Sequence, residues 1–363
     1  MLSNGHGEDL SGALLGRALQ TEGHDVEALP LVGKGQPYRD AGIGLIGGTQ
    51  EFSTGGLGYT SLRGRLTELV QGQVIYLLRR LIRLLRIAKR YDLVVVIGDV
   101  IPVMAAWLSR RPVATYLVAY SSHYEGRLRL PWPCSDCLRS PRFKAIFSRD
   151  QLSADDLSIQ LQRHVNFLGN PFMDPVLSDA QRLPPAHRRL GLLPGSRRPE
   201  LEQNLLLLLR VIDQLPEAWR DNGELQLELA LVSSLQDVEL SALVAQGQWH
   251  LEAESGNKPS ALRRGGCRIW IRRGNFGAVL HSSDLLLCMA GTAAEQAVGL
   301  ARPVLQLVGQ GPQFTEGFAE AQRRLLGPTV FCAPGEAGDP VTLARTAQTV
   351  SYTHLTLPTI SDV

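Results

Sequence analysis

Short runs of apolar and β-branched residues alternate along the chain with longer segments of helical periodicity. This alternation is typical of α/β proteins, in which helices join parallel strands. Two sets of strands are expected, at 43–46, 93–97, 113–118, 145–147 and 165–168, and at 189–193, 225–232, 267–271, 284–288, 304–308 and 329–331. The pattern predicts two doubly wound parallel-sheet domains that face a cleft.

A proline-rich stretch separates the two sets of strands. Residues 171–188 contain four prolines and are predicted to be a linker between an N-terminal domain at 1–170 and a C-terminal domain at 189–350. We expect most of the first strand to be missing, because a Gly-rich turn follows the start of the chain almost at once. Residues 351–363 break from the preceding pattern and are predicted to be a non-native tail.

Composition excludes several classes of protein. The net charge of +2 argues against a dedicated nucleic-acid binder, which usually has a strong excess of basic residues. Five cysteines in 363 residues fit reduced thiols in the cytoplasm better than a disulfide scaffold. No apolar run reaches the length of a membrane span.

The stretch 191–200 predicts a strand that runs into a Pro194-Gly195-Ser196 turn, with a helix beginning near Glu200. Free main-chain N–H groups at such a helix start favour an anion, and Arg197 can bind a phosphate through two parallel hydrogen bonds. The alternative is an ordinary strand-to-helix loop with a solvated arginine pair.

A second small-residue turn follows the strand at 284–288. Gly291 and Thr292 open a helix and would let a ligand approach the backbone. Glu295, one turn further, can accept hydrogen bonds from the vicinal hydroxyls of a ribose. The alternative is a capping or surface glutamate.

Two further motifs place ionisable groups after strands. His6, Glu8 and Asp9 crowd the N-terminal turn, where we expect hydrogen bonds to a substrate; their spacing matches no standard set of metal ligands. The alternative is that the acids simply favour a helix start. Asp99 follows the strand at 93–97 and is either a general base with a raised pKa or a helix N-cap.

Together these motifs resemble the lipid-A-disaccharide synthase family of UDP-sugar glycosyltransferases. The resemblance covers most of residues 1–345 and is carried by Leu-Pro-Gly-Ser-Arg at 193–197, Gly-Asn-Pro at 169–171 and Gly-Thr-Ala-Ala-Glu at 291–295. The stretch 3–9, with 313–315 and 318–322, is closer to a branch described as lipid-A-disaccharide synthase-related.

The resemblance implies the GT-B fold, two Rossmann-like domains of which the second binds the UDP-sugar donor. Gly195, Ser196 and Arg197 would lie near the diphosphate, and Gly291, Thr292 and Glu295 would line the nucleotide. Asp99 would lie where the family's general base lies, in the acceptor domain, and we predict that His6 and Glu8 of the N-terminal turn belong to the same catalytic set. Direct displacement would invert the anomeric centre, and no metal cofactor is expected, since the chain has no Asp-x-Asp motif. The family's usual Gly-Glu-x-Ser-Gly-Asp start is replaced here by residues 7–12, so the donor class is better supported than the acceptor.

The segment 74–90 is amphipathic at helical spacing. The expected apolar face holds Val74, Leu77, Leu78, Leu81, Leu85 and Ala88, and the opposite face Arg79, Arg83, Arg86 and Arg90. The simpler interpretation is a helix packed on the sheet. A peripheral helix at an anionic membrane surface is the alternative, which a lipid-linked acceptor would make sensible.

Two other functions are left open by the sequence. A UDP-sugar 2-epimerase would share the architecture and need no acceptor. A non-catalytic nucleotide-sugar or lipid-binding protein would bind without turnover, and fold alone does not separate these possibilities.

Overall fold

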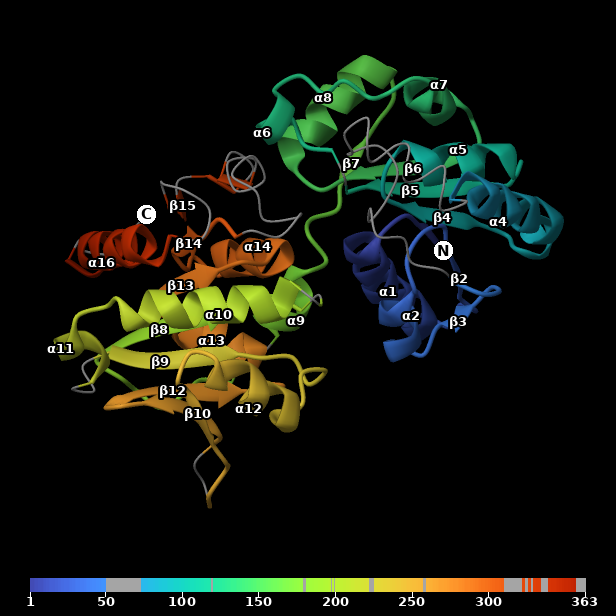
Figure 1. Ribbon diagram of the computed structural model, residues 1–363. Coiled ribbons are helices and arrows are strands. Elements are labelled where there is room, and N and C mark those ends of the chain that lie inside the picture. Colours follow the sequence, from blue (N-terminus) through green and yellow to red (C-terminus); the bar gives the residue numbers. More distant parts are fainter. Residues whose placement is uncertain are drawn as a thin grey trace. The chain divides into compact units, whose positions relative to one another are not determined.

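The computed structural model describes residues 1–49, 73–118, 120–178, 181–196, 198, 200–221, 225–256, 259–309, 322–323, 326–327, 329–333 and 339–356; at 6, 73, 74, 124, 125 and 351–356 it describes the backbone alone. The chain divides into two compact units, Met1–Phe172 and Met173–Val363 (Figure 1). Each unit is an α/β domain built on one largely parallel sheet, which confirms the predicted fold class.

The sheet of the first unit has seven parallel strands in the order β3-β2-β1-β4-β5-β6-β7. These strands are β1 (Leu2–Ser3), β2 (Glu27–Pro30), β3 (Gly44–Leu45), β4 (Val94–Ile97), β5 (Val113–Leu117), β6 (Phe143–Ser148) and β7 (Asn166–Phe167). β1 pairs with β2 on one side and with β4 on the other. The strand order therefore reverses between β1 and β4, which is the position where doubly wound sheets bind their ligands.

Helices cover both faces of this sheet. Figure 1 shows α1 and α2 on one side and α5 and α7 on the other. The helices of the unit are α1 (His6–Thr21), α2 (Gln36–Asp40), α4 (Gln73–Ile87), α5 (Val100–Leu108), α6 (Ser122–Glu125), α7 (Cys134–Arg139) and α8 (Gln151–Leu161), with a 3₁₀ turn, η1 (Ala88–Arg90). Buried Val96, Val103 and Leu138 bring β4, α5 and α7 into one core, while Ala13 and Tyr38 join α1 and α2 in another.

The second unit repeats the same strand order. Its sheet runs β10-β11-β12-β9-β8-β13-β14-β15, and the six strands from β12 to β15 are parallel. The strands are β8 (Arg188–Leu193), β9 (Leu225–Ala230), β10 (His250–Glu252), β11 (Ala261–Arg264), β12 (Cys267–Arg272), β13 (Leu285–Cys288), β14 (Val304–Gln306) and β15 (Val330–Cys332). The antiparallel β10 and β11 extend one edge, and the order reverses between β8 and β13.

The helices of this unit are α9 (Met173–Leu177), α10 (Glu200–Asp213), α11 (Glu217–Arg220), α12 (Asp237–Ala245), α13 (Phe276–Ser282), α14 (Gly291–Gly299) and α16 (Pro340–Thr356). The leucine-rich α10 is buried on several sides because it packs in one core with the sheet, α12 and α16. α9 lies within the predicted linker and buries Val176 against the second unit. α16 extends through Thr356, into the segment predicted to be non-native, and residues 357–363 lie outside the described residues.

All eleven predicted strands are present, and β1 is the short first strand that the N-terminal turn implied. Among the described residues, three further strands, β2, β10 and β11, were missed. β2 combines Glu27 with Pro30 and lacks β-branched residues, so its composition does not favour a strand. β10 and β11 contain histidine and arginine side chains and are placed by pairing with β12. No helix in the described ranges is both long enough and apolar enough to cross a bilayer.

The predicted apolar face of the segment 74–90 is wrong in part. Leu84 and Ala88 of this segment are buried, whereas Leu78 and Leu85 are exposed, contrary to the prediction. α4 carries more apolar residues than one face holds, and the packed face includes the buried Arg80, whose polar head binds main-chain carbonyl groups. The side chain of Val74 lies outside the described residues.

Candidate active site

The turns after β1 and β4 bring two sequence motifs together in the first unit. Asn4 follows β1 directly, and Gly98 and Asp99 follow β4. Because β1 and β4 are neighbouring parallel strands, their carboxyl ends lie at the same edge of the sheet. The N-terminal turn and the Asp99 turn, predicted separately, thus form one site at the point where the strand order reverses.

Asp99 is held by hydrogen bonds from two directions. One oxygen, Oδ1, accepts from the main-chain N–H of Ile101 at 2.9 Å, so the side chain caps α5. Both carboxylate oxygens also lie near Asn4 Nδ2, at 3.3 Å for Oδ1 and 3.1 Å for Oδ2. With 7% of its surface exposed, Asp99 is a buried, oriented carboxylate. It is an N-cap, as one of the two interpretations of the sequence predicted, and its role as proton acceptor stays a prediction.

Glu8 lies in the first turn of α1 and extends toward the Asp99 turn. Its Oε2 accepts the main-chain N–H of Asn4 at 2.8 Å. Gly98 has φ +140°, and a Cβ atom at that position would lie 3.0 Å from both Cδ and Oε1 of Glu8. Glycine at 98 therefore allows the Glu8 carboxyl group to lie against the backbone next to Asp99.

Burial and mutual repulsion change the acidity of both groups. Burial raises the pKa of Glu8 well above its ordinary value, and the charge of Asp99 raises it further. Burial also raises the pKa of Asp99, and the hydrogen bonds from Ile101 and Asn4 lower it in part. Two carboxyl groups in this relation titrate as a pair, and Glu8 holds a proton to higher pH than usual. Such a pair can take up and release protons at a higher pH than two isolated carboxyl groups would.

A buried layer beneath the pair supports α1. Asp9 is 1% exposed, and its Oδ1 accepts the Ser3 hydroxyl at 2.6 Å. The Tyr38 hydroxyl donates to Ser3 Oγ at 3.0 Å. Burial raises the pKa of Asp9 to about 7. Asp9 thus contacts the interior, and Glu8 is the acid of this turn that lies beside Asp99.

Arg80 of α4 supports the same edge of the sheet. Its guanidinium group donates to the carbonyl oxygens of Pro30, Ile46 and Gly48 at distances between 2.6 and 3.1 Å. Pro30 ends β2, and Ile46 directly follows β3. A single buried cation therefore satisfies the main chain of two turns that flank the site.

The second unit has a corresponding pair of turns after β8 and β13. Gly195 has φ +99°, and a Cβ atom there would lie 3.3 Å from the Met289 carbonyl oxygen. The Asn204 side chain donates to the Pro194 carbonyl at 2.9 Å, which holds the first turn against α10. Ala290 is the N-cap of α14 and provides no side-chain cap, so its helix start is suited to an anion.

The predicted donor residues fall on these two turns. Gly195 and Ser196 lie on the first, and Gly291 and Thr292 open α14 on the second. Glu295 follows within α14 and is half-buried. Arg197 lies outside the described residues, as does the side chain of His6. The neighbouring Arg198 forms ion pairs with Glu202 and Glu239 on the surface.

The sequence did not predict that the Asn4 side chain links the N-terminal turn to the Asp99 turn. Asn4 was recognised as part of a turn, but its contact with Asp99 joins residues 95 positions apart. Its position directly after a strand was the available signal. Tyr38 and Arg80 were also missed, because neither lies in a recognisable motif.

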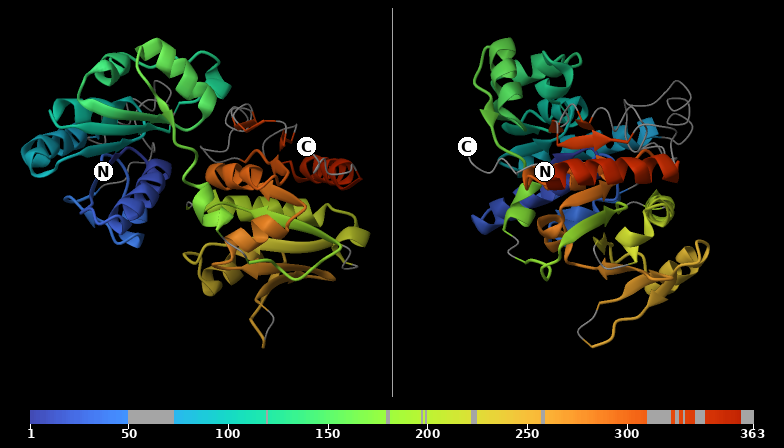
Figure 2. Two further views of the ribbon diagram at one scale, coloured as in Figure 1. Left: turned by 180° about the vertical axis from the view of Figure 1, so that it is seen from behind. Right: turned by 90° about the vertical axis from the view of Figure 1, so that its left-hand side faces the viewer.

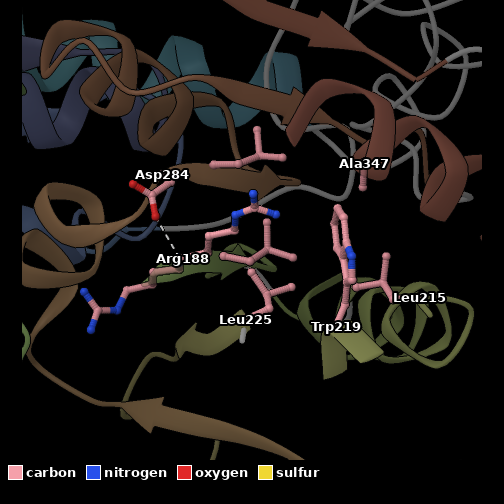
Figure 3. Close-up of a pocket in the computed structure, with 9 residues that line it drawn as sticks. Arg188, Leu215, Trp219, Leu225, Asp284 and Ala347 are labelled. Carbon is pink, nitrogen blue, oxygen red and sulfur yellow. Dashed lines mark hydrogen bonds between the residues drawn. The ribbon is translucent and has the colours of Figure 1, made fainter. Parts of the chain in front are cut away.

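A pocket of about 10 Å³ lies at the opposite edge of the second sheet (Figure 3). Arg188, Leu225 and Asp284 line it at the amino ends of β8, β9 and β13, and the main-chain N–H of Arg189 donates to Asp284 at 2.8 Å. Its volume barely suffices for one water molecule. It is therefore a packing defect and no candidate for a substrate site.

Comparison with curated proteins gives a match over a small part of the chain. No family model matches the chain. A lipid-A-disaccharide synthase from Geobacter sulfurreducens is 36% identical over 89 residues, and the match spans 22% of this chain and 22% of that protein. The match thus covers about a fifth of the length of this curated relative.

Solved structures match over nearly the whole chain. The calicheamicin glycosyltransferase CalG4 has a TM-score of 0.56 at 16% identity, covering 96% of this chain and 88% of that one. The spinosyn rhamnosyltransferase SpnG, complexed with spinosyn aglycone, has a TM-score of 0.54 at 18% identity, covering 98% and 94%. These likenesses establish the fold, two Rossmann-like domains of the GT-B type, and leave the reaction to be argued from the site.

Proposed function

We propose that this protein is a glycosyltransferase that moves a sugar from a UDP-sugar donor to an acceptor hydroxyl group. The observation that carries the proposal is the buried pair of Glu8 and Asp99 where the first sheet reverses its strand order. Transfer to a hydroxyl requires a proton acceptor, and a carboxyl pair with raised pKa values is suited to that task. The glycosyltransferase fold of the chain supports the same reaction.

The two carboxyl groups take different parts in the proposed reaction. Asp99, oriented by Asn4 and the start of α5, supplies the negative charge of the pair. The pair accepts the acceptor's hydroxyl proton while that oxygen bonds to the anomeric carbon. The bond from this carbon to the UDP oxygen breaks at the same time, and UDP leaves with the electron pair. A single displacement of this kind inverts the anomeric centre.

The donor nucleotide is assigned to the second unit. Main-chain N–H groups near Ser196 and at the start of α14 would bind the diphosphate, and Arg197 would add a charged contact. Glu295 would accept hydrogen bonds from the ribose. We propose that these groups stabilise the leaving UDP without a metal ion, so turnover should persist in EDTA. The likeness to a lipid-A-disaccharide synthase supports a lipid-linked acceptor.

The donor assignment is tested by thermal unfolding with UDP, ADP or GDP. A nucleotide that binds only the folded chain at 100 times its Kd stabilises it by about 2.7 kcal/mol. We expect UDP alone to raise the melting temperature, and Glu295→Gln to reduce the shift. Glu217→Gln changes an exposed glutamate of the same unit and should leave the shift unchanged. No shift with UDP for the folded wild type would refute the donor assignment.

The reaction is tested by release of UDP from a panel of UDP-sugars, with and without hydroxyl acceptors that include lipid-linked sugars. We expect Asp99→Asn and Glu8→Gln to lower turnover by about 100-fold or more, as for loss of a general base. Asp25→Asn, at an exposed aspartate, serves as the control. Conversion of a UDP-sugar without acceptor would instead favour a 2-epimerase, and UDP binding without turnover a binding protein.

A further inference from the structure

The start of α5 is held by two side chains that come from different places in the chain. The main-chain N–H of Ile101 donates to Asp99 Oδ1 at 2.9 Å. The main-chain N–H of Val100 donates to the Tyr120 hydroxyl oxygen at 3.2 Å. The first N–H groups of a helix have no acceptor within the helix and need partners of this kind. Asp99 and Tyr120 therefore divide the capping of α5 between them.

Tyr120 follows the strand that lies next to β4 in the sheet. β5 pairs in parallel with β4 and ends at Leu117, shortly before the tyrosine. The side chain of Tyr120 is 8% exposed and packs in the same core as Val96 of β4 and Val103 of α5. Three neighbouring strand ends, those of β1, β4 and β5, thus contribute side chains to the candidate site.

The two residues that follow Tyr120 are bound to α8 and its N-cap. The Ser121 hydroxyl donates to Asp150 Oδ2 at 2.9 Å, and the main-chain N–H of Ser122 donates to Ser153 Oγ at 2.7 Å. Figures 1 and 2 show α8, in green, beside α6, which begins at Ser122. Because its main chain is anchored in this way and its ring lies in the core, Tyr120 can hold the start of α5 in a fixed position.

A neutral acceptor for the Val100 N–H spares the Asp99 carboxylate. Asp99 Oδ1 already accepts the Ile101 N–H, and Oδ2 lies 3.1 Å from Asn4 Nδ2. A further hydrogen bond to the charged form would make the carboxylate a weaker base and would change its orientation. By accepting the Val100 N–H, the phenol keeps this group from competing for the carboxylate.

We propose that Tyr120 is a positioning residue that keeps the Asp99 carboxylate aimed at the acceptor hydroxyl group. The inference rests on the proposed sugar transfer, in which Asp99 supplies the negative charge of the carboxyl pair. Tyr120 acts through the main chain of α5 and need not touch acceptor or donor. Substitution by phenylalanine keeps the buried ring and removes the oxygen that accepts the Val100 N–H.

The proposal predicts a change in the titration of Asp99. Loss of the phenol oxygen frees the Val100 N–H, whose partial positive charge then acts on the carboxylate of the residue directly before it. Stabilisation of the charged form lowers the pKa of a carboxyl group. Tyr120→Phe should therefore move the titration of Asp99 to lower pH.

Other groups around Asp99 do not obscure this change. Among the described residues, the titratable groups that act on Asp99 are the Glu8 carboxyl of α1 and the Cys134 thiol of α7. Burial raises the pKa of Cys134 to about 12, so the thiol stays neutral in an assay near neutral pH. Glu8 titrates together with Asp99 in every variant, and the side chain of His6, outside the described residues, is likewise unchanged between variants.

The matched pair of variants is Tyr120→Phe and Tyr116→Phe. Tyr116 also is buried in the first unit, and its hydroxyl donates to the main-chain carbonyl of Gly169 at 3.0 Å. We expect Tyr120→Phe to lower kcat for UDP release by about tenfold or more. KM should change by less than about twofold, because no substrate contact is lost. The acid limb of the kcat profile should move to lower pH in Tyr120→Phe and stay in place in Tyr116→Phe.

A second measurement does not depend on turnover. NMR of isotope-labelled aspartate carboxyl carbons follows their titration, and Asp99→Asn identifies the Asp99 signal by its loss. We expect Tyr120→Phe to lower the midpoint by about half a pH unit or more, and Tyr116→Phe to leave it unchanged. Circular dichroism verifies that every variant is folded.

The outcomes separate this proposal from the proposed function. An unchanged Asp99 midpoint in Tyr120→Phe, or equal shifts in Tyr120→Phe and Tyr116→Phe, would overturn the positioning role even where kcat falls. A kcat of Tyr120→Phe equal to that of the wild type would overturn it as well. If the wild type turns over no UDP-sugar, the sugar transfer is refuted, and the titration alone decides whether Tyr120 controls Asp99.

Discussion

The buried Asp9 predicts a pH dependence of stability that one substitution should remove. Its ordinary pKa is 3.8, and burial raises the pKa to about 7 in the folded chain. A raised carboxyl pKa means that folding favours the protonated form. The stabilising contribution is therefore complete below about pH 4, decreases as the pH rises, and is lost above about pH 7.

The size of the effect follows from the shift. Each pH unit between the two pKa values changes the free energy of unfolding by about 1.4 kcal/mol, so the cost rises by roughly 2 to 3 kcal/mol from about pH 5 to about pH 8. Asn at position 9 keeps an oxygen for the Ser3 hydroxyl and cannot ionise. We expect the free energy of unfolding of Asp9→Asn to rise by this amount relative to that of the wild type from about pH 5 to about pH 8. The amide also shifts the stability by an amount that does not depend on pH.

Urea unfolding of both proteins in matched buffers, followed by circular dichroism and fluorescence, measures this difference. Glu8, Asp99 and the other titrating groups are present in both chains, so their contributions largely cancel. Asp25→Asn, at an exposed acid, should run parallel to the wild type. A difference between wild type and Asp9→Asn that stays constant within about 0.5 kcal/mol over the whole range would refute the reasoning, given an m-value that does not change.

Three further substitutions test the architecture of the two edges. Arg80→Met keeps the aliphatic stem and leaves buried carbonyl groups without donors, so thermal or urea unfolding should show a loss of about 3 to 5 kcal/mol. Gly98→Ala should reduce turnover more than stability, because its Cβ would displace the Glu8 carboxyl group; a fall in melting temperature with unchanged turnover would contradict this. Gly195→Ala places a Cβ near the Met289 carbonyl at a positive φ, so it should weaken stabilisation by UDP, and an unaltered UDP shift would argue against the donor turn.

The sequence predicted which residues follow the strands at the candidate site, but it did not predict which of these residues contact one another. The apolar run before Gly98 and Asp99 marks a buried strand, and the glycine marks where it stops. That Asp99 meets Asn4 depends on β1 lying next to β4, which only the packing of the whole sheet decides. Each half of the candidate site was therefore predictable, and their junction was not.

The spacing of apolar residues likewise predicted a helix at 73–87, but it did not predict which face of the helix packs on the sheet. A repeat near 3.6 residues shows which side chains share a face, but α4 has two apolar faces. The choice between them was made by Arg80, whose carbonyl partners are supplied by turns elsewhere in the sequence. The strand at Glu27–Pro30 was missed for a similar reason, since its neighbours rather than its own residues make it a strand.

The two units share one strand order, but the groups at the point where the order reverses differ in charge. Where the first sheet reverses, a visiting phosphate would meet two carboxyl groups, which repel it whenever either is ionised. Where the second sheet reverses, it would meet glycine, alanine and uncapped main-chain N–H groups. On charge alone, we expect a diphosphate to bind the turns of the second unit rather than those of the first. A few side chains at the strand ends are therefore enough to give two sheets of the same strand order different preferences for an anionic ligand.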